Sequence, residues 1–172
     1  MSRRLVVITG FMGAGKTTVG RTLARLLGET FLDLDDAVRE FEGRGPRALI
    51  DEEGEARFRD AETRALRRVL EEGAARVVAT GGGAWTLARN RSLVAEHGGL
   101  SVWLDAPFDL CLRRIEDEGT RAARPFARDA ARARRLYEER LAAYRQAHLR
   151  IPVAPEAGAE ELAAAIAAAL AT

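Results

Sequence analysis

Cysteine is nearly absent from the sequence, in which Cys111 is the only one. A single thiol excludes an intramolecular disulfide and a cysteine zinc cluster, and its two leucine neighbours predict a small buried hydrophobe. No stretch approaches the roughly 18–20 apolar residues of a membrane-spanning helix. The apolar run near the start spans about five residues, and a secretory signal needs roughly 7–15. We therefore expect a cytoplasmic protein with no membrane partner.

An excess of charge of either sign is also missing. The 27 basic residues are balanced by 26 acidic ones, which leaves a formal net charge of +1. This balance gives no sign of a surface built to bind nucleic acid. A chain of 172 residues that is 47% apolar and 31% charged suits one globular domain with a sizeable core. We expect residues 1–172 to form a single domain that is a monomer without a nucleic-acid partner.

Short apolar segments alternate with segments of helical periodicity along the chain. The apolar runs predict strands at 5–9, 30–35, 76–80, 100–107 and 149–154. The helical spacing predicts helices at 16–27, 36–42, 55–72, 85–96, 107–116, 129–148 and 157–171. Residues 43–46 are predicted to interrupt the helical structure, and residues 116–130 resemble a mobile loop. Such alternation indicates βαβ units and an α/β fold with a mainly parallel sheet, in which ligands bind at the carboxyl ends of the strands.

Lysine is as scarce as cysteine, and the one lysine lies in a glycine-rich motif. Residues 10–17, GFMGAGKT, match GxxxxGK[ST] between a predicted strand and a predicted helix. The glycines let successive N–H groups point at phosphate oxygens, and the helix N-terminus favours an anion. Lys16 supplies a compact ammonium where the wider fork of arginine would fit less well. We predict nucleotide binding by Gly13, Ala14, Gly15, Lys16, Thr17 and Thr18, with the Thr17 hydroxyl available to magnesium.

This motif, at residues 10–17, is a P-loop, which several classes of protein share. Other scarce residues narrow the choice among these classes. A guanine-specific GTPase carries an Asn-Lys-x-Asp motif, but Lys16 is already part of the P-loop and Asn90 is followed by arginine. Gln146, the only glutamine, falls in a predicted helix, so no loop glutamine can orient an attacking water. The chain is also too short for the extra sheet of most motor ATPases. A small-molecule kinase is the class that remains.

Two carboxylates follow the second predicted strand. In a strand, residues i and i+2 face the same side, so Asp33 and Asp35 are expected to project together beside the P-loop. One of them can hold magnesium, directly or through water, while the other accepts a proton from an attacking hydroxyl. Asp36 is interpreted as the N-cap of the next helix. A solvated strand end would give the same pattern.

Two further motifs contain candidate binding residues. The segment GEARFRDAE (54–62) places Glu55, Arg59 and Glu62 on one helix face, which also suits a surface ladder of ion pairs. Gly81–Gly83 directly follow a predicted strand and can let a ligand approach the backbone. A plain loop has the same composition.

Together these segments resemble shikimate kinases. The resemblance rests on GFMGAGKTTVGRTLARLLG, FLDLD, GEARFRDAE, TGGGA, the Arg-Pro pair at 124–125 and RLAAY (140–144), in that order over residues 5–150. The ordered set after the P-loop is far more specific than the P-loop itself. The resemblance implies a three-layer P-loop fold like that of nucleoside-monophosphate kinases, with five parallel strands. It also implies ATP- and Mg²⁺-dependent phosphorylation of the 3-hydroxyl of shikimate, a step of aromatic amino-acid biosynthesis.

The resemblance also implies roles for the single residues that would bind magnesium and the acid substrate. Asp33 would join Thr17 near Mg²⁺, and Asp35 would meet the substrate hydroxyls as the candidate base. Arg59 and Arg140 would bind the substrate carboxylate, because a planar guanidinium pairs with it through two hydrogen bonds. The alternative for Arg140 is a charge on the helix surface, since glutamates precede it. The substrate-binding loop would consist of Gly81, Gly82 and Gly83.

The remaining implied roles concern the nucleotide. Arg124 would reach the phosphates from a mobile lid at 117–129, where it adds positive charge to that of Lys16. Arg114 is expected to stack on the adenine. Two other functions stay open, a kinase for another small hydroxy acid such as gluconate and a catalytically silent nucleotide-binding relative. The silent relative would be expected to lose Lys16, Asp35 or Arg59, and all three are present.

Overall fold

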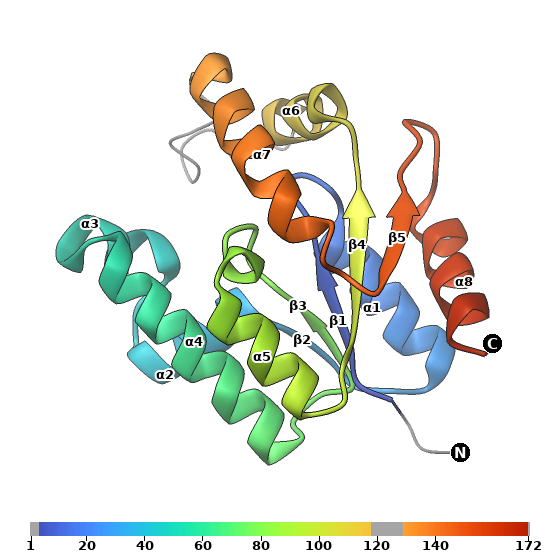
Figure 1. Ribbon diagram of the computed structural model, residues 1–172, viewed down its shortest axis with the longest axis horizontal. Helices are drawn as coiled ribbons and strands as arrows, with labels where there is room; N and C mark the ends of the chain where they lie inside the picture. Colours follow the sequence, from blue (N-terminus) through green and yellow to red (C-terminus); the bar gives the residue numbers. More distant parts are fainter. Residues whose placement is uncertain (1–3, 118–128, 172) are drawn as a thin grey trace.

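The computed structural model describes residues 4–117 and 129–171 (Figure 1). Its strands are β1 (Val6–Thr9), β2 (Phe31–Asp33), β3 (Val77–Ala79), β4 (Leu100–Asp105) and β5 (Leu149–Pro152). Its helices are α1 (Lys16–Leu27), α2 (Leu34–Glu42), α3 (Pro46–Glu53), α4 (Glu55–Glu72), α5 (Ala88–Glu96), α6 (Phe108–Asp117), α7 (Ala130–Tyr144) and α8 (Ala159–Leu170). A short 3₁₀ turn, η1 (Ala84–Thr86), follows β3.

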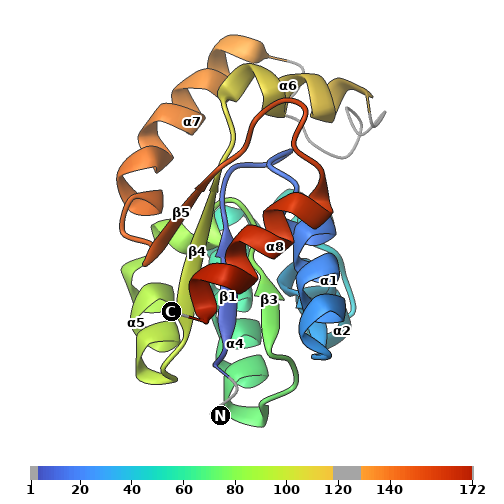
Figure 2. The same ribbon diagram turned by 90° about the vertical axis from the view of Figure 1, so that its right-hand side faces the viewer.

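The strands form one parallel sheet in the order β2-β3-β1-β4-β5. Helices α1 and α8 pack together on one face of the sheet, and α4 and α5 cover the other (Figures 1 and 2). Helices α6 and α7 lie beyond the carboxyl ends of the strands (Figure 1). The predicted three-layer α/β fold with five parallel strands is confirmed.

The central strands are apolar because helices cover both of their faces. Val7 and Ile8 of β1 and Val78 of β3 are 0% exposed. β-Branched residues suit such strands, and complete burial of each side chain contributes about 1.5–3 kcal/mol. On α1, a Cβ at Gly20 would lie 2.5 Å from the Phe31 ring. This glycine lets α1 approach the sheet closely, and that contact positions the N-terminus of α1 beside the strand ends.

The junction of β2 and α2 differs from its prediction. β2 ends at Asp33 and α2 begins at Leu34, so Asp35 lies in the first helical turn rather than on the strand. Asp33 is the N-cap, with Oδ1 accepting the Asp35 N–H at 3.0 Å. The prediction that Asp36 caps the helix is wrong, because Asp33 is the N-cap and Asp36 lies within the first helical turn. Asp36 instead accepts a hydrogen bond from Arg39 on the surface, at 2.6 Å.

The segment after α2 contains a helix that the sequence pattern did not predict. Gly43 ends α2 in the left-handed conformation (φ 69°), as the predicted break requires. Pro46 then starts α3, because a proline needs no hydrogen-bond partner for its nitrogen at the first helical position. The predicted helix at 85–96 is divided into η1 and α5.

The remaining observations concern single elements. Cys111 is 0% exposed, which confirms the prediction of a buried hydrophobe, and burial raises the pKa of its thiol to about 11. Most of the predicted lid at 117–129, including Arg124, lies outside the described residues. Among the helices of the described ranges, none combines the length and apolarity needed to cross a membrane.

Candidate active site

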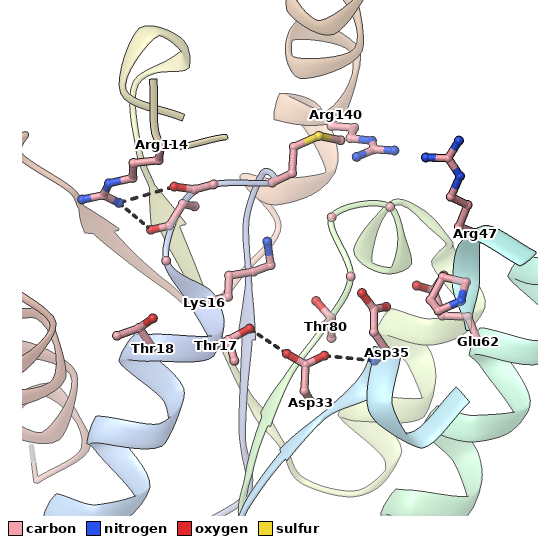
Figure 3. A pocket seen from close by; sticks show the side chains of 18 of the residues that line it. Lys16, Thr17, Thr18, Asp33, Asp35, Arg47, Glu62, Thr80, Arg114 and Arg140 are labelled. Carbon is pink, nitrogen blue, oxygen red and sulfur yellow. Dashed lines mark hydrogen bonds between the residues drawn. The ribbon is translucent and has the colours of Figure 1, made fainter. Parts of the chain in front are cut away.

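A cavity of about 800 Å³ opens at the carboxyl ends of the central strands (Figure 3). One end of it, the phosphate end, is formed by the P-loop and the start of α1. The other, which we call the acid end, is formed by the starts of α2 and α4, the glycine loop after β3 and the inner face of α7. The predicted site residues that line it are Gly13, Ala14, Gly15, Lys16, Thr17, Thr18, Asp33, Asp35, Arg59, Gly81, Gly82, Gly83, Arg114 and Arg140. The structure therefore brings together every predicted site residue that it describes.

The phosphate end is a turn that only glycine accommodates. Gly13 and Gly15 have φ of 79° and 96°, in the left-handed region. No side chain caps the N-terminus of α1, so no side-chain acceptor competes with an anion for its first N–H groups. The Lys16 ammonium donates to Phe11 O at 2.8 Å, within the turn itself. This arrangement combines main-chain donors with one mobile cation, as phosphate binding requires.

Thr17 and Asp33 meet beside this turn. The Thr17 hydroxyl donates to Asp33 Oδ2 at 2.6 Å, and both residues line the cavity. Within the described residues, no cluster of three or more histidine, cysteine or acidic side chains could hold a metal by itself. A hydroxyl and one carboxylate nevertheless fit Mg²⁺, which takes oxygen ligands and keeps waters and substrate phosphates in its shell.

Arg59 and Glu62 form a buried ion pair at the acid end. Arg59 Nη1 donates to Glu62 Oε2 at 2.6 Å, while the Glu55 carboxylate lies 3.4 Å from Arg59 Nη2. The Glu62 side chain is 0% exposed, so this pair is no surface ladder. Burial raises the pKa of Glu62, and the charge of Arg59 offsets part of that rise. Glu62 therefore fixes the Arg59 guanidinium at the cavity wall.

Arg140 is the second cation of the acid end. It is 8% exposed, which contradicts the alternative of a helix-surface charge. Its guanidinium lies 5.8 Å from the Phe11 ring centre and points into the cavity (Figure 3). No carboxylate of the described residues forms an ion pair with it. The charge of Glu62 acts on Arg140 only without direct contact, so the guanidinium fork can still bind an anionic ligand.

At the three positions after β3, charged side chains lie so close that a residue larger than glycine would not fit. A Cβ at Gly83 would lie 2.2 Å from Arg59 Nη2, and one at Gly82 would lie 3.0 Å from an Arg140 nitrogen. A Cβ at Gly81 would lie 2.8 Å from Glu62 Oε1 and 3.2 Å from an Asp35 oxygen. The segment is thus no plain loop, since each glycine makes room for a charged group of the acid end.

Tyr144 holds this loop from α7. Its hydroxyl donates to Gly82 O at 2.6 Å. Burial raises the pKa of Tyr144 to about 12, so the hydroxyl keeps its proton and remains a donor at neutral pH. Tyr144 was not singled out in the sequence, where only RLAAY pointed to it.

Arg114 lies over the P-loop from α6. Its Nη1 is 3.3 Å from Ala14 O and 3.4 Å from Gly13 O (Figure 3). These contacts place a guanidinium at the nucleotide end, while stacking on the adenine stays a prediction.

Helix α3 contributes lining residues that sequence reasoning missed. Arg47, Ile50 and Asp51 face the cavity, and Arg47 points toward the same space as Arg140 (Figure 3). Arg47 is half-exposed and lies 3.4 Å from the Asp51 carboxylate. The signal that could have found this helix is Pro46 at its start, followed by the fully buried Leu49.

Comparisons with known proteins identify the family of this chain. The family model for shikimate kinase matches residues 12–171. The curated shikimate kinase of Ruegeria pomeroyi is 41% identical over 98% of this chain and 86% of its own length.

Two solved structures differ in how similar they are to this chain. The shikimate kinase of Acinetobacter baumannii in complex with shikimate superposes with a TM-score of 0.88 at 35% identity, covering 98% of this chain and 93% of that one. A gluconokinase of Sinorhizobium meliloti, at 19% identity and a TM-score of 0.66 over 98% of this chain and 94% of its own, shares the fold alone. With the family model and the curated relative in agreement, this chain belongs to the shikimate kinase family.

Proposed function

We propose that this cavity transfers the γ-phosphate of ATP to the 3-hydroxyl of shikimate, giving shikimate 3-phosphate and ADP. The observation that carries the proposal is the placement of Arg140, a buried cation without a carboxylate partner among the described residues, opposite the P-loop in one cavity. ATP is the co-substrate expected of the family. Placing an acid near Arg140 and a triphosphate at Lys16 brings the acceptor hydroxyl and the γ-phosphate toward Asp35.

The acid end recognises a small carboxylate. Arg59 and Arg140 offer planar guanidinium forks, which bind a carboxylate through paired hydrogen bonds. Arg59 is already oriented by Glu62 and Arg140 by the Phe11 ring, so little ordering of side chains remains at binding. The backbone of Gly81–Gly83 lies between these groups and can contact the ring of the substrate.

Asp35 is the candidate base. During transfer, a bond forms between the acceptor oxygen and the γ-phosphorus, the bond from that phosphorus to the β–γ bridging oxygen breaks, and ADP leaves. The hydroxyl proton passes to the Asp35 carboxylate, which lines the cavity. Lys16 exchanges its internal bond to Phe11 O for the phosphate oxygens, where its charge favours the transition state.

Thr17 and Asp33 are the residues that would hold Mg²⁺. When bound, the ion would supply positive charge to the triphosphate. Asp33 would hold it directly or through a water, while its Oδ1 accepts the Asp35 N–H. In this arrangement the Asp33 carboxylate holds the backbone of Asp35.

The proposal has three further parts. Arg124, beyond the described residues, completes the charge around the phosphates from a lid at 117–129. Arg114 stacks on the adenine. The chain acts as a monomeric, single-domain enzyme of the cytoplasm, without nucleic-acid or membrane partners.

The direct test is ADP release with shikimate, gluconate and a panel of other hydroxy acids. We expect shikimate to have the highest kcat/KM by a wide margin, with an absolute requirement for a divalent cation. Turnover of gluconate above shikimate would replace the substrate, and ATP binding without turnover of any acid would favour a non-catalytic relative.

Asp35→Asn tests the base. It is expected to lower kcat about 10²–10⁴-fold, the usual contribution of an acid/base group, while calorimetric ATP affinity stays unchanged. Near-normal turnover would remove Asp35 from this role.

A further inference from the structure

Helix α5 does not line the cavity, yet its side chains hold the loop of the acid end. Asn90 Nδ2 donates to Ala84 O at 2.8 Å. Arg91 Nη1 donates to Trp85 O at 2.7 Å and to Thr86 O at 3.0 Å. Every carbonyl of η1 thus has a side-chain donor from α5. Because η1 follows the glycine loop directly, α5 contributes to the position of Gly81–Gly83, together with Tyr144.

Asn90 also reaches the helix that carries Arg59. It is 1% exposed, and its Oδ1 accepts a hydrogen bond from Thr63 Oγ1 at 2.8 Å. Thr63 Oγ1 lies 3.0 Å from Arg59 O, one turn earlier on α4. The opposite orientation of the amide would place two acceptor oxygens together at Ala84, so both ends of the Asn90 amide are determined by their partners.

The space between these two segments is small. A Cβ at Gly83 would lie 2.2 Å from Arg59 Nη2. The loop and the guanidinium are therefore in close contact, with no space for a methyl group between them. A shift of the loop toward α4 would therefore displace the Arg59 guanidinium. A misplacement of about 1 Å can cost about 10²-fold in rate.

We propose that Asn90 is a positioning residue, which sets the spacing between the glycine loop and Arg59 and thereby the affinity for the acid substrate. The proposal rests on the function proposed above. Asn90 contacts neither substrate and acts through Ala84 O on one side and Thr63 on the other. The same hydroxyl of Thr63 accepts a hydrogen bond from Arg89 Nε at 3.0 Å, which keeps it in place.

The first experiment compares Thr63→Val with Thr63→Ser. Valine has the shape of threonine without the hydroxyl, so it breaks the link to Asn90, whereas serine keeps it. We expect Thr63→Val to raise the KM for shikimate about tenfold, the scale of one buried hydrogen bond, with the KM for ATP within twofold of wild type. Thr63→Ser is expected to stay within about threefold of wild type on both. Thr22→Val, on the P-loop helix, controls for loss of a half-buried threonine hydroxyl.

The second experiment uses Asn90→Asp, which keeps an acceptor for Thr63 but loses the donor to Ala84 O. We expect the same selective rise in the KM for shikimate. In the Thr63→Val/Asn90→Asp double variant, the rise should be smaller than the product of the single effects, because both changes break one connection. Thermal unfolding of each variant shows whether it is folded at the assay temperature.

Outcomes separate this inference from the proposed function. If wild type fails to phosphorylate shikimate, the proposed function itself is wrong. If wild type is active and folded Thr63→Val and Asn90→Asp keep the KM for shikimate within twofold, only the positioning role is overturned. An equal rise in KM for both substrates, in step with a lower Tm, would also overturn it, because the role would then be merely structural.

Discussion

The phosphate-binding turn is one continuous segment, residues 10–18, whereas the acid end is assembled from α2, α4, the glycine loop and α7. At the phosphate end the ligand meets mainly backbone, whose geometry follows from glycines and a helix start. At the acid end it meets side chains whose directions depend on packing between distant segments. A local motif is therefore enough to build a phosphate site, while recognition of the acid depends on the whole fold.

Phe11 connects the two ends. Its carbonyl accepts from Lys16, and its ring lies against Arg140. The ring also packs edge-on against Tyr137, with centroids 5.2 Å apart. The ends are thus built separately but meet at one buried side chain of the P-loop.

Among the variants that compare the two ends, Lys16→Met should have the largest effect, and it tests whether the ends function separately. Removal of one charged donor at the transition state is expected to lower kcat about 10²–10³-fold. Shikimate affinity, measured by calorimetry without nucleotide, should remain within twofold. A parallel loss of shikimate affinity would mean that the two ends are not independent.

Arg140→Lys is the reciprocal change at the acid end. Lysine keeps the charge but loses the planar fork, so the KM for shikimate should rise about 10- to 100-fold, the scale of a charged hydrogen bond. The KM for ATP should not change. Steady-state kinetics with each substrate varied in turn decides, and an unchanged KM for shikimate would exclude Arg140 from carboxylate binding.

Gly83→Ala sharpens the comparison, because it adds one methyl group without backbone strain. Gly83 has φ of −96°, which alanine adopts readily, but the new Cβ would displace the Arg59 guanidinium. We expect about a tenfold rise in the KM for shikimate, as for one lost hydrogen bond. Gly158→Ala is the matched control, since a Cβ there meets nothing within 4 Å. Equal kinetics for the two variants would contradict the steric role of Gly83.

Glu42→Gln should have the smallest effect and concerns stability rather than the site. Glu42 on α2 accepts hydrogen bonds from Arg57 and Arg64 of α4, and the bond from Arg57 is the main reason why its pKa is lowered. The substitution should cost about 1 kcal/mol or less at neutral pH, as for other partly exposed pairs.

The pH dependence of that difference has a definite sign. A lowered pKa means that the unfolded chain binds the proton more readily, so the contribution is present above the ordinary glutamate pKa of 4.5. It is lost as the pH falls through the lower, folded value. Thermal unfolding at pH 7 and at progressively lower pH should show the wild type and the variant converging, and a constant difference would contradict the ion-pair origin.

Predictions from the sequence succeeded where local chemistry decides structure. The P-loop, the alternation of strands and helices, and the burial of Cys111 all follow from short segments and are confirmed. The pairing of Asp33 with Asp35 was predicted for a strand, and the two do adjoin one cavity. The reason is different, because Asp33 caps α2, which begins at Leu34, two residues before the predicted start.

Other features depended on tertiary contacts. The burial of Arg140 was not visible in its own segment, where glutamates flank it, because the P-loop phenylalanine covers it from a distance of more than a hundred residues in the chain. Helix α3 was missed because Gly45 before it and Pro46 at its start indicate a break equally well. In the sequence, Asn90 was considered only in excluding a guanine-binding motif, and its partners on two other elements cannot be read from its neighbours.

By itself, the amino-acid order determined the class of fold, the phosphate-binding turn and the set of residue types available for catalysis, since glycine conformations, helix starts and apolar periodicity act over a few residues. The tertiary structure alone decided which arginines are buried, which glycine lies under which guanidinium and how α5 holds the loop. Those properties depend on distances between segments far apart in the chain, and such distances exist only once the core has packed.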